Sequence, residues 1–435
     1  MTQEIEQRIE QIGRGEVPEG YQQVNGYVIP EGWHLVAFSK KFKRLLRRNT
    51  TACNNVLTIS AQLGLVSQKE YYDKDIASED KSGYFLLQHG EFAYNKSYSS
   101  GYPYGAIKRL EKYEEGIVSP LYICFEPKQE TNADFYSHYF EAGLYNREIY
   151  RFAQEGARNH GLLNISTEDF FDGTLIVPPE EEQRKMAEIL ATCDRVIELK
   201  QKLLDELKKL KKVCLAKMFP QEGKTVPEIR FPGFTAPWER SRVLDLLIQP
   251  VTDGPHETPN LVEEGIPFLS VEAVVENRLD FSKKRGCISE EYNDECCKKY
   301  KPELYDVYLV KSGATVGKTA IVETADRFNI WSPLAAMRCS GNTNPYFLYY
   351  LIQTKDFQTQ VFDKASSGTQ PNLSMRELER FEVVVPSDIK EQKAVADSLT
   401  ILDQLITAHQ CELEKAQKKK KALMKLLLTG IIRVR

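Results

Sequence analysis

Residues 177–218, VPPEEEQRKMAEILATCDRVIELKQKLLDELKKLKKVCLAKM, form the stretch of this 435-residue chain that decides its fold. Pro178 and Pro179 stand where a helix can begin, three glutamates follow at 180–182, and lysines crowd the second half. Acidic residues near the N-terminus and basic residues near the C-terminus both interact favourably with a helix dipole. The stretch therefore predicts one long helix, about 60 Å in length at ~1.5 Å per residue.

Apolar residues follow one side of this predicted helix at alternating steps of four and three. That spacing is typical of a coiled-coil seam, and Lys200 is its one polar interruption. The predicted seam residues are Ile189, Cys193, Val196, Lys200, Leu203, Leu207, Leu210 and Cys214. A helix of this length with one apolar stripe requires a partner helix.

The chain supplies a second stretch of the same kind at 388–428, DIKEQKAVADSLTILDQLITAHQCELEKAQKKKKALMKLLL. The two stretches align without a gap, and Lys200 falls opposite His409 in this alignment. The aligned pairs are Gln183 with Gln392, Ala187 with Ala396, Leu190 with Leu399, Asp194 with Asp403 and Ile197 with Ile406. The residues predicted for the second seam are Leu402, His409, Leu413 and Leu423.

Shorter motifs ahead of the two helices repeat as well, with a period near 210 residues. They are Trp33 and Trp238, Lys96-Ser97 and Lys311-Ser312, Ser119-Pro120-Leu121 and Ser332-Pro333-Leu334, and Asn164-Ile165-Ser166 and Asn372-Leu373-Ser374. This period is too long for a solenoid repeat. The pattern instead predicts a duplicated unit that consists of one globular domain followed by one long helix.

Composition places bounds on the function. The 58 basic and 62 acidic side chains are balanced, so composition alone gives no sign of a polyanionic partner. No run of 18 apolar residues exists and the N-terminus is charged, which argues against a membrane span and a secretory signal. Nine cysteines without framework or zinc spacing indicate reduced thiols, and we expect a soluble cytoplasmic protein without a metal site.

The chain divides into predicted segments at its proline- and glycine-rich stretches. We expect a short helix and an arm at 1–30, a globular domain at 31–178, the long helix with the start of a linker at 179–222, a second globular domain at 223–387, and the C-terminal long helix at 388–435. Each globular domain mixes short strands with helical pieces. A strand, a turn and a strand are predicted within 307–322, and a closing strand within 381–386.

Several elements of the second half resemble one known family. They are the linker FPQEGKTVPEIRFPGF (219–234), TDGPH (252–256), GIPFL (265–269), KSGATVGKTA (311–320) and GTQPNLS (368–374). Together with the paired globular-plus-helix layout, they make the chain similar to the specificity subunit of type I restriction–modification enzymes. The resemblance covers essentially the whole chain, although the first half has no clean counterpart of TDGPH or GATVGKT.

The resemblance implies an α+β fold with two target recognition domains, each followed by a long helix, and with the two helices packed as an antiparallel coiled coil. It implies a partner set of double-stranded DNA, two methyltransferase (modification) subunits, and restriction or translocase subunits in the full complex. Each recognition domain would read one half of a bipartite, asymmetric DNA site. S-adenosylmethionine is expected on the partner methyltransferase, and this chain is expected to hold no catalytic, cofactor-binding or metal-binding residue.

The candidate DNA contacts lie in loops rich in Tyr, Ser, Gly, Asn and Gln, whose side chains offer donors and acceptors to base edges. They are Lys96, Arg158, Asn159, His256, Lys311, Lys318, Gln370 and Asn372. A hydrogen-bonded turn explains the same composition, and His256 suits a turn as well as base reading. The basic stretch KKFKRLLRR (40–48) and the lysine runs 208–212 and 418–421 suit either phosphate contact or solvated helix faces.

Two other function classes remain open beside the DNA-recognition subunit. A self-contained methyltransferase requires a cofactor loop and a nuclease requires a clustered carboxylate–lysine motif, and the sequence shows neither. Nucleotide binding is disfavoured too, because in SGATVGKT Ser312 stands where a phosphate-binding loop requires glycine. A coiled-coil scaffold without a DNA role predicts no sequence-selective footprint. Binding of S-adenosylmethionine by the isolated chain would favour the methyltransferase.

Overall fold

The computed structural model of the chain describes residues 3–51, 53–60, 63–72, 81–97, 101–153, 163–365 and 371–434. The chain forms two compact units. Unit 1 consists of Met1–Leu199 and Leu413–Arg435, and unit 2 consists of Lys200–Glu412. Each unit therefore holds one globular part and a segment of each long helix. No helix among the described residues has both the length and the apolar content needed to cross a membrane.

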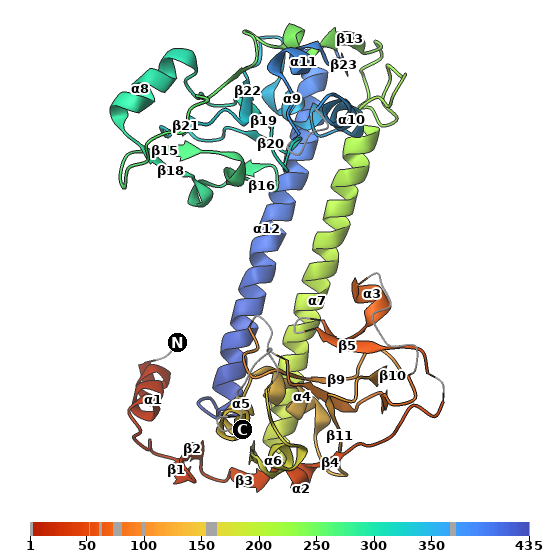
Figure 1. Cartoon of the computed structure of the whole chain (residues 1–435), viewed down its shortest axis with the longest axis vertical. Helices are drawn as coiled ribbons and strands as arrows, with labels where there is room; N and C mark the ends of the chain where they lie inside the picture. The colour runs from red at the N-terminus through yellow and green to blue at the C-terminus, as the bar shows by residue number, and fades with distance from the viewer. Residues whose placement is uncertain are drawn as a thin grey trace. The chain divides into compact units, whose positions relative to one another are not determined.

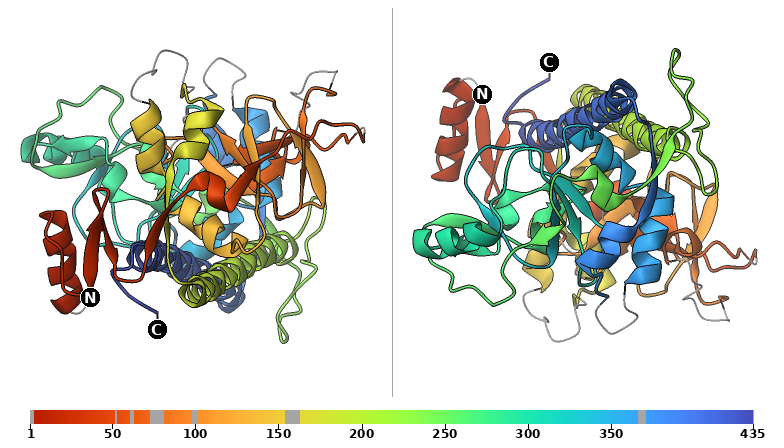
Figure 2. Two further views of the ribbon diagram at one scale, coloured as in Figure 1. Left: turned by 90° about the horizontal axis from the view of Figure 1, so that it is seen from below. Right: turned by 90° about the horizontal axis from the view of Figure 1, so that it is seen from above.

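The two predicted long helices are present as α7 (Glu180–Lys217) and α12 (Ile389–Leu428), the green and blue ribbons of Figure 1. Within unit 2, Lys200 Nζ lies 2.7 Å from Glu412 Oε2, and Lys211 Nζ lies 2.6 Å from Asp403 Oδ1. Residue numbers rise along α7 as they fall along α12, so these segments run antiparallel. In unit 1 the ion pair of Asp194 with Lys420 follows the same order. Both views in Figure 2 show the two helices side by side.

Most of the predicted seam residues face the partner helix or a core. Ile189 and Leu423 pack against the core of unit 1, Leu402 packs against the core of unit 2, and Leu413 is buried. Cys193 and Leu207 are half-buried. Lys200 and His409 both approach Glu412, at 2.7 Å and 3.7 Å, so the polar interruption of the seam is an ion-paired position.

The seam prediction is wrong for Val196, Leu203 and Leu210, which are exposed, while Leu204 is almost fully buried. Ile197 is half-buried beside the exposed Val196. The inward side of α7 therefore steps by four residues from Cys193 to Ile197, where the heptad pattern steps by three, and it continues through Lys200, Leu204 and Leu207.

Unit 1 is built around a sheet with the strand order β4-β11-β8-β9. These strands are β4 (Phe42–Arg44), β11 (Ile123–Pro127), β8 (Phe92–Asn95) and β9 (Ala106–Arg109). Further pairs are β1 (Tyr21–Val24) with β2 (Tyr27–Pro30), β3 (His34–Ala37) with β12 (Thr174–Val177), β5 (Leu57–Ser60) with β6 (Gly64–Ser67), and β7 (Phe85–Gln88) with β10 (Glu115–Val118). The helices of its globular part are α1 (Gln3–Gly13), α2 (Phe38–Lys41), α3 (Gln68–Tyr72), α4 (Ala133–Glu141), α5 (Asn146–Ala153) and α6 (Thr167–Asp172).

Unit 2 contains the corresponding sheet with the order β14-β22-β19-β20. These strands are β14 (Thr252–Asp253), β22 (Leu334–Met337), β19 (Val307–Val310) and β20 (Thr319–Ile321). The other strands are β13 (Glu239–Arg242), β15 (Ile266–Leu269), β16 (Val274–Val275), β17 (Arg278–Leu279), β18 (Gly286–Ile288), β21 (Asn329–Ile330) and β23 (Glu382–Val385). The helices are α8 (Glu290–Lys299), α9 (Pro345–Leu351), α10 (Lys355–Lys364) and α11 (Met375–Arg380), with 3-10 turns at Val243–Leu246, Val271–Ala273 and Phe281–Lys283.

The repeated sequence motifs have repeated structural roles. In both units the strand after the tryptophan pairs antiparallel with the strand before the long helix, β3 with β12 and β13 with β23. Ser166 and Ser374 are N-caps, and each side chain accepts a hydrogen bond from the backbone N–H three residues later. Ile165 and Leu373, which precede these caps, are buried. The duplication predicted from the sequence is therefore structural.

The first turn of each long helix carries a buried glutamate that is held by a tryptophan and an arginine. In unit 2, Glu391 accepts from Trp238 Nε1 at 3.0 Å and from Arg230 Nε at 2.6 Å. In unit 1, Glu182 accepts from Trp33 Nε1 at 3.3 Å and from Arg433 Nε at 2.8 Å. We call each set a tryptophan clamp. The arginine of each clamp lies in the segment that follows the other long helix.

Candidate nucleic-acid interface

Two of the predicted DNA-contact residues of unit 2, His256 and Lys311, converge on one buried carboxylate, Asp253, which is 0% exposed at the end of β14. Its Oδ1 is ion-paired with Lys299, and its Oδ2 lies 3.3 Å from Lys311 Nζ and 3.1 Å from His256 Nε2. A carboxylate this deeply buried requires cationic partners, because desolvation of an unpaired charge is costly. We call these four residues the Asp253 cluster.

The turn TDGPH has its shape because the backbone of Gly254 approaches the neighbouring strand closely. A Cβ on Gly254 would lie 1.8 Å from the Ile330 carbonyl oxygen, so no other residue fits there. The Ser332 N–H donates to the Pro255 carbonyl at 3.2 Å and fixes the next residue of the turn. His256 therefore leaves the turn with its side chain 68% exposed, while its imidazole still reaches the buried carboxylate.

Lys311 and Asn372 are brought together by a short antiparallel pairing. The Leu373 N–H donates to the Lys311 carbonyl at 2.7 Å, the Gly313 N–H donates to the Pro371 carbonyl at 3.0 Å, and Ser312 and Asn372 form a β-bridge. Asn372 is exposed beside Lys311, whose ammonium group is turned inward to Asp253. Thus the segments TDGPH, KSG and PNLS, which lie far apart in the sequence, meet at one end of the β14-β22-β19-β20 sheet, where strands β14 and β19 finish.

An arginine and a tryptophan flank the same turn. The Trp331 Nε1 donates to the Glu257 carbonyl at 3.1 Å, and the guanidinium of Arg285 lies 4.0 Å from the centre of the Trp331 ring. Cation–π stacking of this kind fixes the position of an exposed arginine. Asp253 thus has two lysines and a histidine as partners, and Arg285 adds an exposed cationic side chain beside the same turn.

Lys318 is exposed and is not among the ion-pair partners of Asp253, although its backbone carbonyl accepts from the N–H of Val310, the residue before Lys311. The candidates Arg158, Asn159 and Gln370 lie outside the described residues. The structure thus brings His256, Lys311 and Asn372 together, while the Lys318 side chain lines a different groove.

In unit 1, Lys96 occupies the position that corresponds to Lys311. Its backbone carbonyl accepts from the Leu163 N–H at 3.1 Å, as the Lys311 carbonyl accepts from Leu373. Its ammonium group donates to the Ile165 carbonyl at 2.8 Å, and burial lowers the pKa of Lys96. β4, the counterpart of β14, carries no aspartate, so the ammonium group of Lys96 bonds to a backbone carbonyl where that of Lys311 pairs with a carboxylate.

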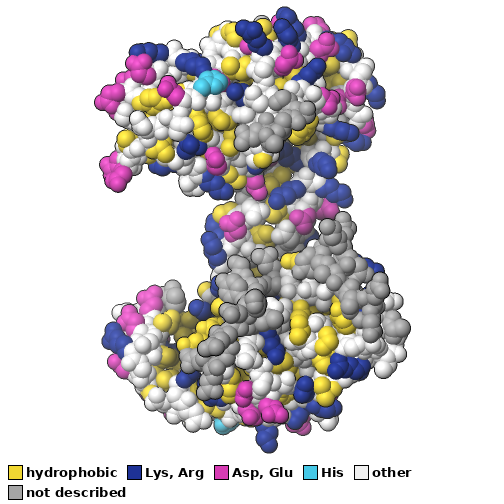
Figure 3. Space-filling view, viewed as in Figure 1, with side chains coloured by type: hydrophobic (Ala, Val, Ile, Leu, Met, Phe, Trp, Pro, Cys, Tyr) yellow, Lys and Arg dark blue, Asp and Glu magenta, His cyan; other side chains and the backbone are white. Residues whose placement is uncertain are grey.

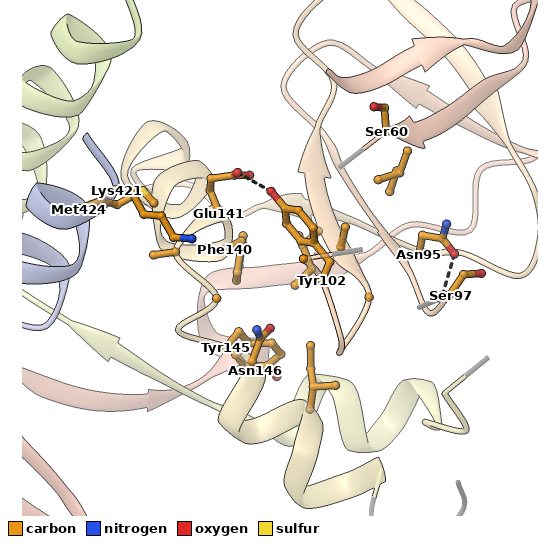
Figure 4. A pocket seen from close by; sticks show the side chains of 18 of the residues that line it. Ser60, Asn95, Ser97, Tyr102, Phe140, Glu141, Tyr145, Asn146, Lys421 and Met424 are labelled. Carbon is orange, nitrogen blue, oxygen red and sulfur yellow. Dashed lines mark hydrogen bonds between the residues drawn. The ribbon is translucent and has the colours of Figure 1, made fainter. Parts of the chain in front are cut away.

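A polar pocket of about 1040 Å³ in unit 1 is lined by residues of β8 and β9 and of the helices α4 and α5. Figure 4 shows the Tyr102 hydroxyl pointing at Glu141, to which it donates at 2.7 Å, and Lys108 is ion-paired with the same carboxylate. Burial and then the Glu141 charge raise the pKa of Tyr102, so its hydroxyl stays a donor. Asn95 accepts from the Ser97 N–H at 3.0 Å. The pocket offers hydroxyl and amide groups of the kind that read base edges.

The basic stretch at 40–48 is not the amphipathic helix that was one of its two interpretations. α2 ends at Lys41, and β4 follows with Phe42 buried in the aromatic core. Arg47 forms a bidentate pair with Glu91, at 3.1 and 2.9 Å. Lys43 lies 3.0 Å from Glu126. Basic groups that are already paired with carboxylates are weak candidates for phosphate contact.

The sequence does not single out Asp253, the central residue of this cluster, although it lies within the TDGPH motif. Lys299, Arg285 and Trp331 are likewise absent from the residues that the sequence predicts as DNA contacts. A buried aspartate next to a turn histidine has no sequence signal that separates it from an ordinary turn aspartate. Its role follows only from the lysines that α8 and β19 bring to it.

Comparison with known proteins gives consistent results. The family model described as the type I restriction modification DNA specificity domain matches residues 112–209 and 256–419. The chain is 24% identical over 434 residues to the type I restriction enzyme MjaVIII specificity subunit of Methanocaldococcus jannaschii, covering 96% of this chain and 97% of that protein. It is also 24% identical over 429 residues to the putative MjaX specificity subunit of the same organism, covering 94% and 95% of the two chains.

Solved structures show the same fold. The type I restriction–modification S subunit from M. genitalium superposes with a TM-score of 0.56 at 14% identity, covering 93% of this chain and 97% of that chain. A chain solved in a study of complex assembly and conformational transition of the type I R-M system gives a TM-score of 0.56 at 16% identity, covering 93% and 100%. Because the family model matches more than half of the residues, the chain belongs to the type I restriction–modification DNA specificity family.

Proposed function

We propose that the chain is the DNA sequence-recognition and assembly subunit of a type I restriction–modification complex. Each globular unit reads one half of a bipartite, asymmetric DNA site, and the long helices carry the modification subunits. The observation that carries the proposal is the family match, which falls in both halves of a chain that is duplicated in sequence and in fold.

In unit 2 the surface that contacts DNA bases is the end of the sheet around the Asp253 cluster. Lys299 and Lys311 neutralise the buried carboxylate and so fix the turn that presents His256, which lowers the conformational entropy lost when DNA binds. At this end of the sheet, the side chains of His256 and Asn372 are exposed and polar, and they can contact base edges. In unit 1 the corresponding surface is the pocket beside Tyr102.

The modification subunits dock on apolar residues that the helix pair leaves exposed. On the unit 2 segment of α7, Leu203, Leu210 and Val213 are 45%, 47% and 41% exposed. Their spacing of seven and three residues places them on one side of the helix. On the unit 2 segment of α12, Ile401 and Leu405 form a further exposed pair at i and i+4. Such stripes suit a helix of a partner protein.

The chain itself carries out no catalytic step in this proposal. S-adenosylmethionine and the methyl-transfer chemistry belong to the modification subunit, and the reading chain selects the DNA sequence that is presented to it. Among the described residues no cluster of His, Cys, Asp and Glu side chains could hold a metal ion. A self-contained methyltransferase would bind S-adenosylmethionine without its partner, which equilibrium dialysis of the isolated chain measures directly.

The test is co-expression of the chain with its modification subunit, followed by long-read mapping of methylated sites. His256→Ala and Asn372→Ala should relax the selected bases in one half-site and leave the other half-site unchanged. Loss of one base contact costs about 1–3 kcal/mol, which is roughly 5- to 150-fold in discrimination. Asn342→Ala, at another exposed asparagine of unit 2, is the matched control. Wild-type methylation at unrelated sequences would refute the proposal and favour a scaffold.

A further inference from the structure

A groove of about 450 Å³ in unit 2 brings the lysine run of α7 next to the turn between β19 and β20. Its cationic lining residues are Lys208, Lys211 and Lys212 from α7 and Lys318 from the turn. From the sequence alone, the lysine run suits phosphate contact or a solvated helix face, and Lys318 suits DNA contact or a hydrogen-bonded turn. Their convergence from elements about 100 residues apart is a feature of the tertiary structure alone.

The groove has an excess of positive charge. No aspartate or glutamate is among its described lining residues. Lys211 is neutralised by Asp403 at 2.6 Å, but Lys208, Lys212 and Lys318 form no ion pair within the described part of the chain. Like charges at i and i+4 on a helix are destabilising, and a third one from a loop adds to the repulsion. An anionic ligand would remove this cost.

The turn that carries Lys318 is held rigidly against α10. Gly317 has a φ of +93°, and a Cβ there would lie 2.3 Å from the Gln358 Oε1 atom. The Gln358 amide donates to the Gly317 carbonyl at 2.9 Å, and the Lys318 carbonyl accepts from the Val310 N–H at 2.8 Å. The lysine therefore leaves a fixed backbone, as a preorganised contact requires.

The lysine face of α7 is separate from its exposed apolar stripe. Lys208 and Lys212 are each two residues away from Leu210. At ~100° per residue, both lysines therefore lie about 200° around the helix from Leu210, on the opposite side. The same segment of α7 thus presents apolar residues on one side and unpaired lysines on the other. Figure 3 shows lysine and arginine side chains gathered where the long helices leave the globular part of unit 2.

We infer that Lys208, Lys212 and Lys318 form a binding site for DNA backbone phosphates, so that the long helix takes part in DNA binding together with the recognition domain. The inference rests on the proposed function and deepens it by separating phosphate contact, in this groove, from base reading, at the Asp253 cluster. Three ammonium groups on two elements suit a chain of phosphates better than a single small anion.

The experiment measures the salt dependence of DNA binding by the complex of this chain with its modification subunits. Each phosphate contact contributes about 0.9 to the slope of log K against log salt. The variant Lys208→Gln/Lys212→Gln/Lys318→Gln should lose about 2 to 3 from this slope. Its affinity should fall equally for specific and for unrelated duplexes, and its methylated sequence should stay the same. The control Lys209→Gln/Lys355→Gln/Lys393→Gln removes three other exposed lysines of unit 2 and should keep the wild-type slope.

Three results would overturn the inference. A wild-type slope in the triple variant would exclude phosphate contact, and failure to co-purify with the modification subunits would reassign the groove to docking. Inorganic tripolyphosphate is titrated as a second probe, and its binding in the absence of any change in the DNA slope would assign the groove to a free anion. Failure of the proposed function itself is distinguishable, since the wild-type complex would then select no sequence.

Discussion

The tryptophan clamp of unit 2 gives the sharpest prediction about stability. The Arg230→Met change removes the guanidinium that donates to both oxygens of Glu391, at 2.6 and 2.8 Å, while keeping an apolar chain of similar length. Glu391 is 3% exposed and would retain only the Trp238 donor at 3.0 Å. The change therefore leaves a nearly uncompensated carboxylate in the first turn of α12.

Breaking a buried ion pair by removal of one partner costs about 3–5 kcal/mol. For a unit of this size, each kcal/mol lowers the melting temperature by about 2–4 °C. We therefore expect the transition of unit 2 to fall by about 6–20 °C in differential scanning calorimetry. The double variant Arg230→Met/Glu391→Gln should recover part of this loss, because it removes the buried charge together with its partner.

Two controls make the result specific. Arg240→Met removes an exposed arginine whose pairing distance to Glu382 is 3.8 Å, and it should cost less than about 1 kcal/mol. Arg433→Met removes the equivalent arginine of unit 1 and should lower the other transition instead. The reasoning is refuted if Arg230→Met costs no more than Arg240→Met, or if the double variant loses the full sum of the two single changes.

Four further outcomes are expected. Burial lowers the pKa of His138 in the folded protein below its ordinary value of 6.5. The neutral imidazole therefore contributes to the free energy of unfolding above pH 6.5, and this contribution is lost as the pH falls toward the folded pKa. Between pH 7.5 and 5.5, denaturant titrations should show a larger loss of stability for the wild type than for His138→Gln. Lys96→Met should lower the melting temperature of unit 1 without changing either half-site, and altered methylation at full stability would count against a structural lysine. Replacement of residues 238–387 by the matching domain of a relative should change one half-site only, and two altered half-sites in methylation mapping would contradict the two-reader proposal. Leu203→Ser with Leu210→Ser should reduce co-purification of the modification subunits at least tenfold while the isolated chain keeps its melting temperature, since both side chains are exposed; unchanged assembly would exclude this docking face.

The sequence by itself determined the architecture of the chain. Prolines, glutamates and lysines marked the ends of two helices of 38 and 40 residues, because capping and dipole effects act within one turn. The gapless alignment of the helices and the repeated N-cap serines revealed the duplication. These signals are local, and each is read from neighbouring residues without knowledge of what packs against them.

The tertiary structure alone decided which residues act together. Whether Val196 or Ile197 faces inward depends on how the two helices pack, and a shift of one residue, about 100° around the helix, turns a predicted seam position outward. The clamp between Glu182 and Arg433 joins residues 251 positions apart, and the sequence gives no sign of it. The sequence likewise gives no sign that Lys299 and Lys311 pair with Asp253, or that Lys318 lies beside α7. A charged side chain has the same local sequence signal whether it is solvated, paired or ready to bind a phosphate, because its partners are brought to it only when the chain folds.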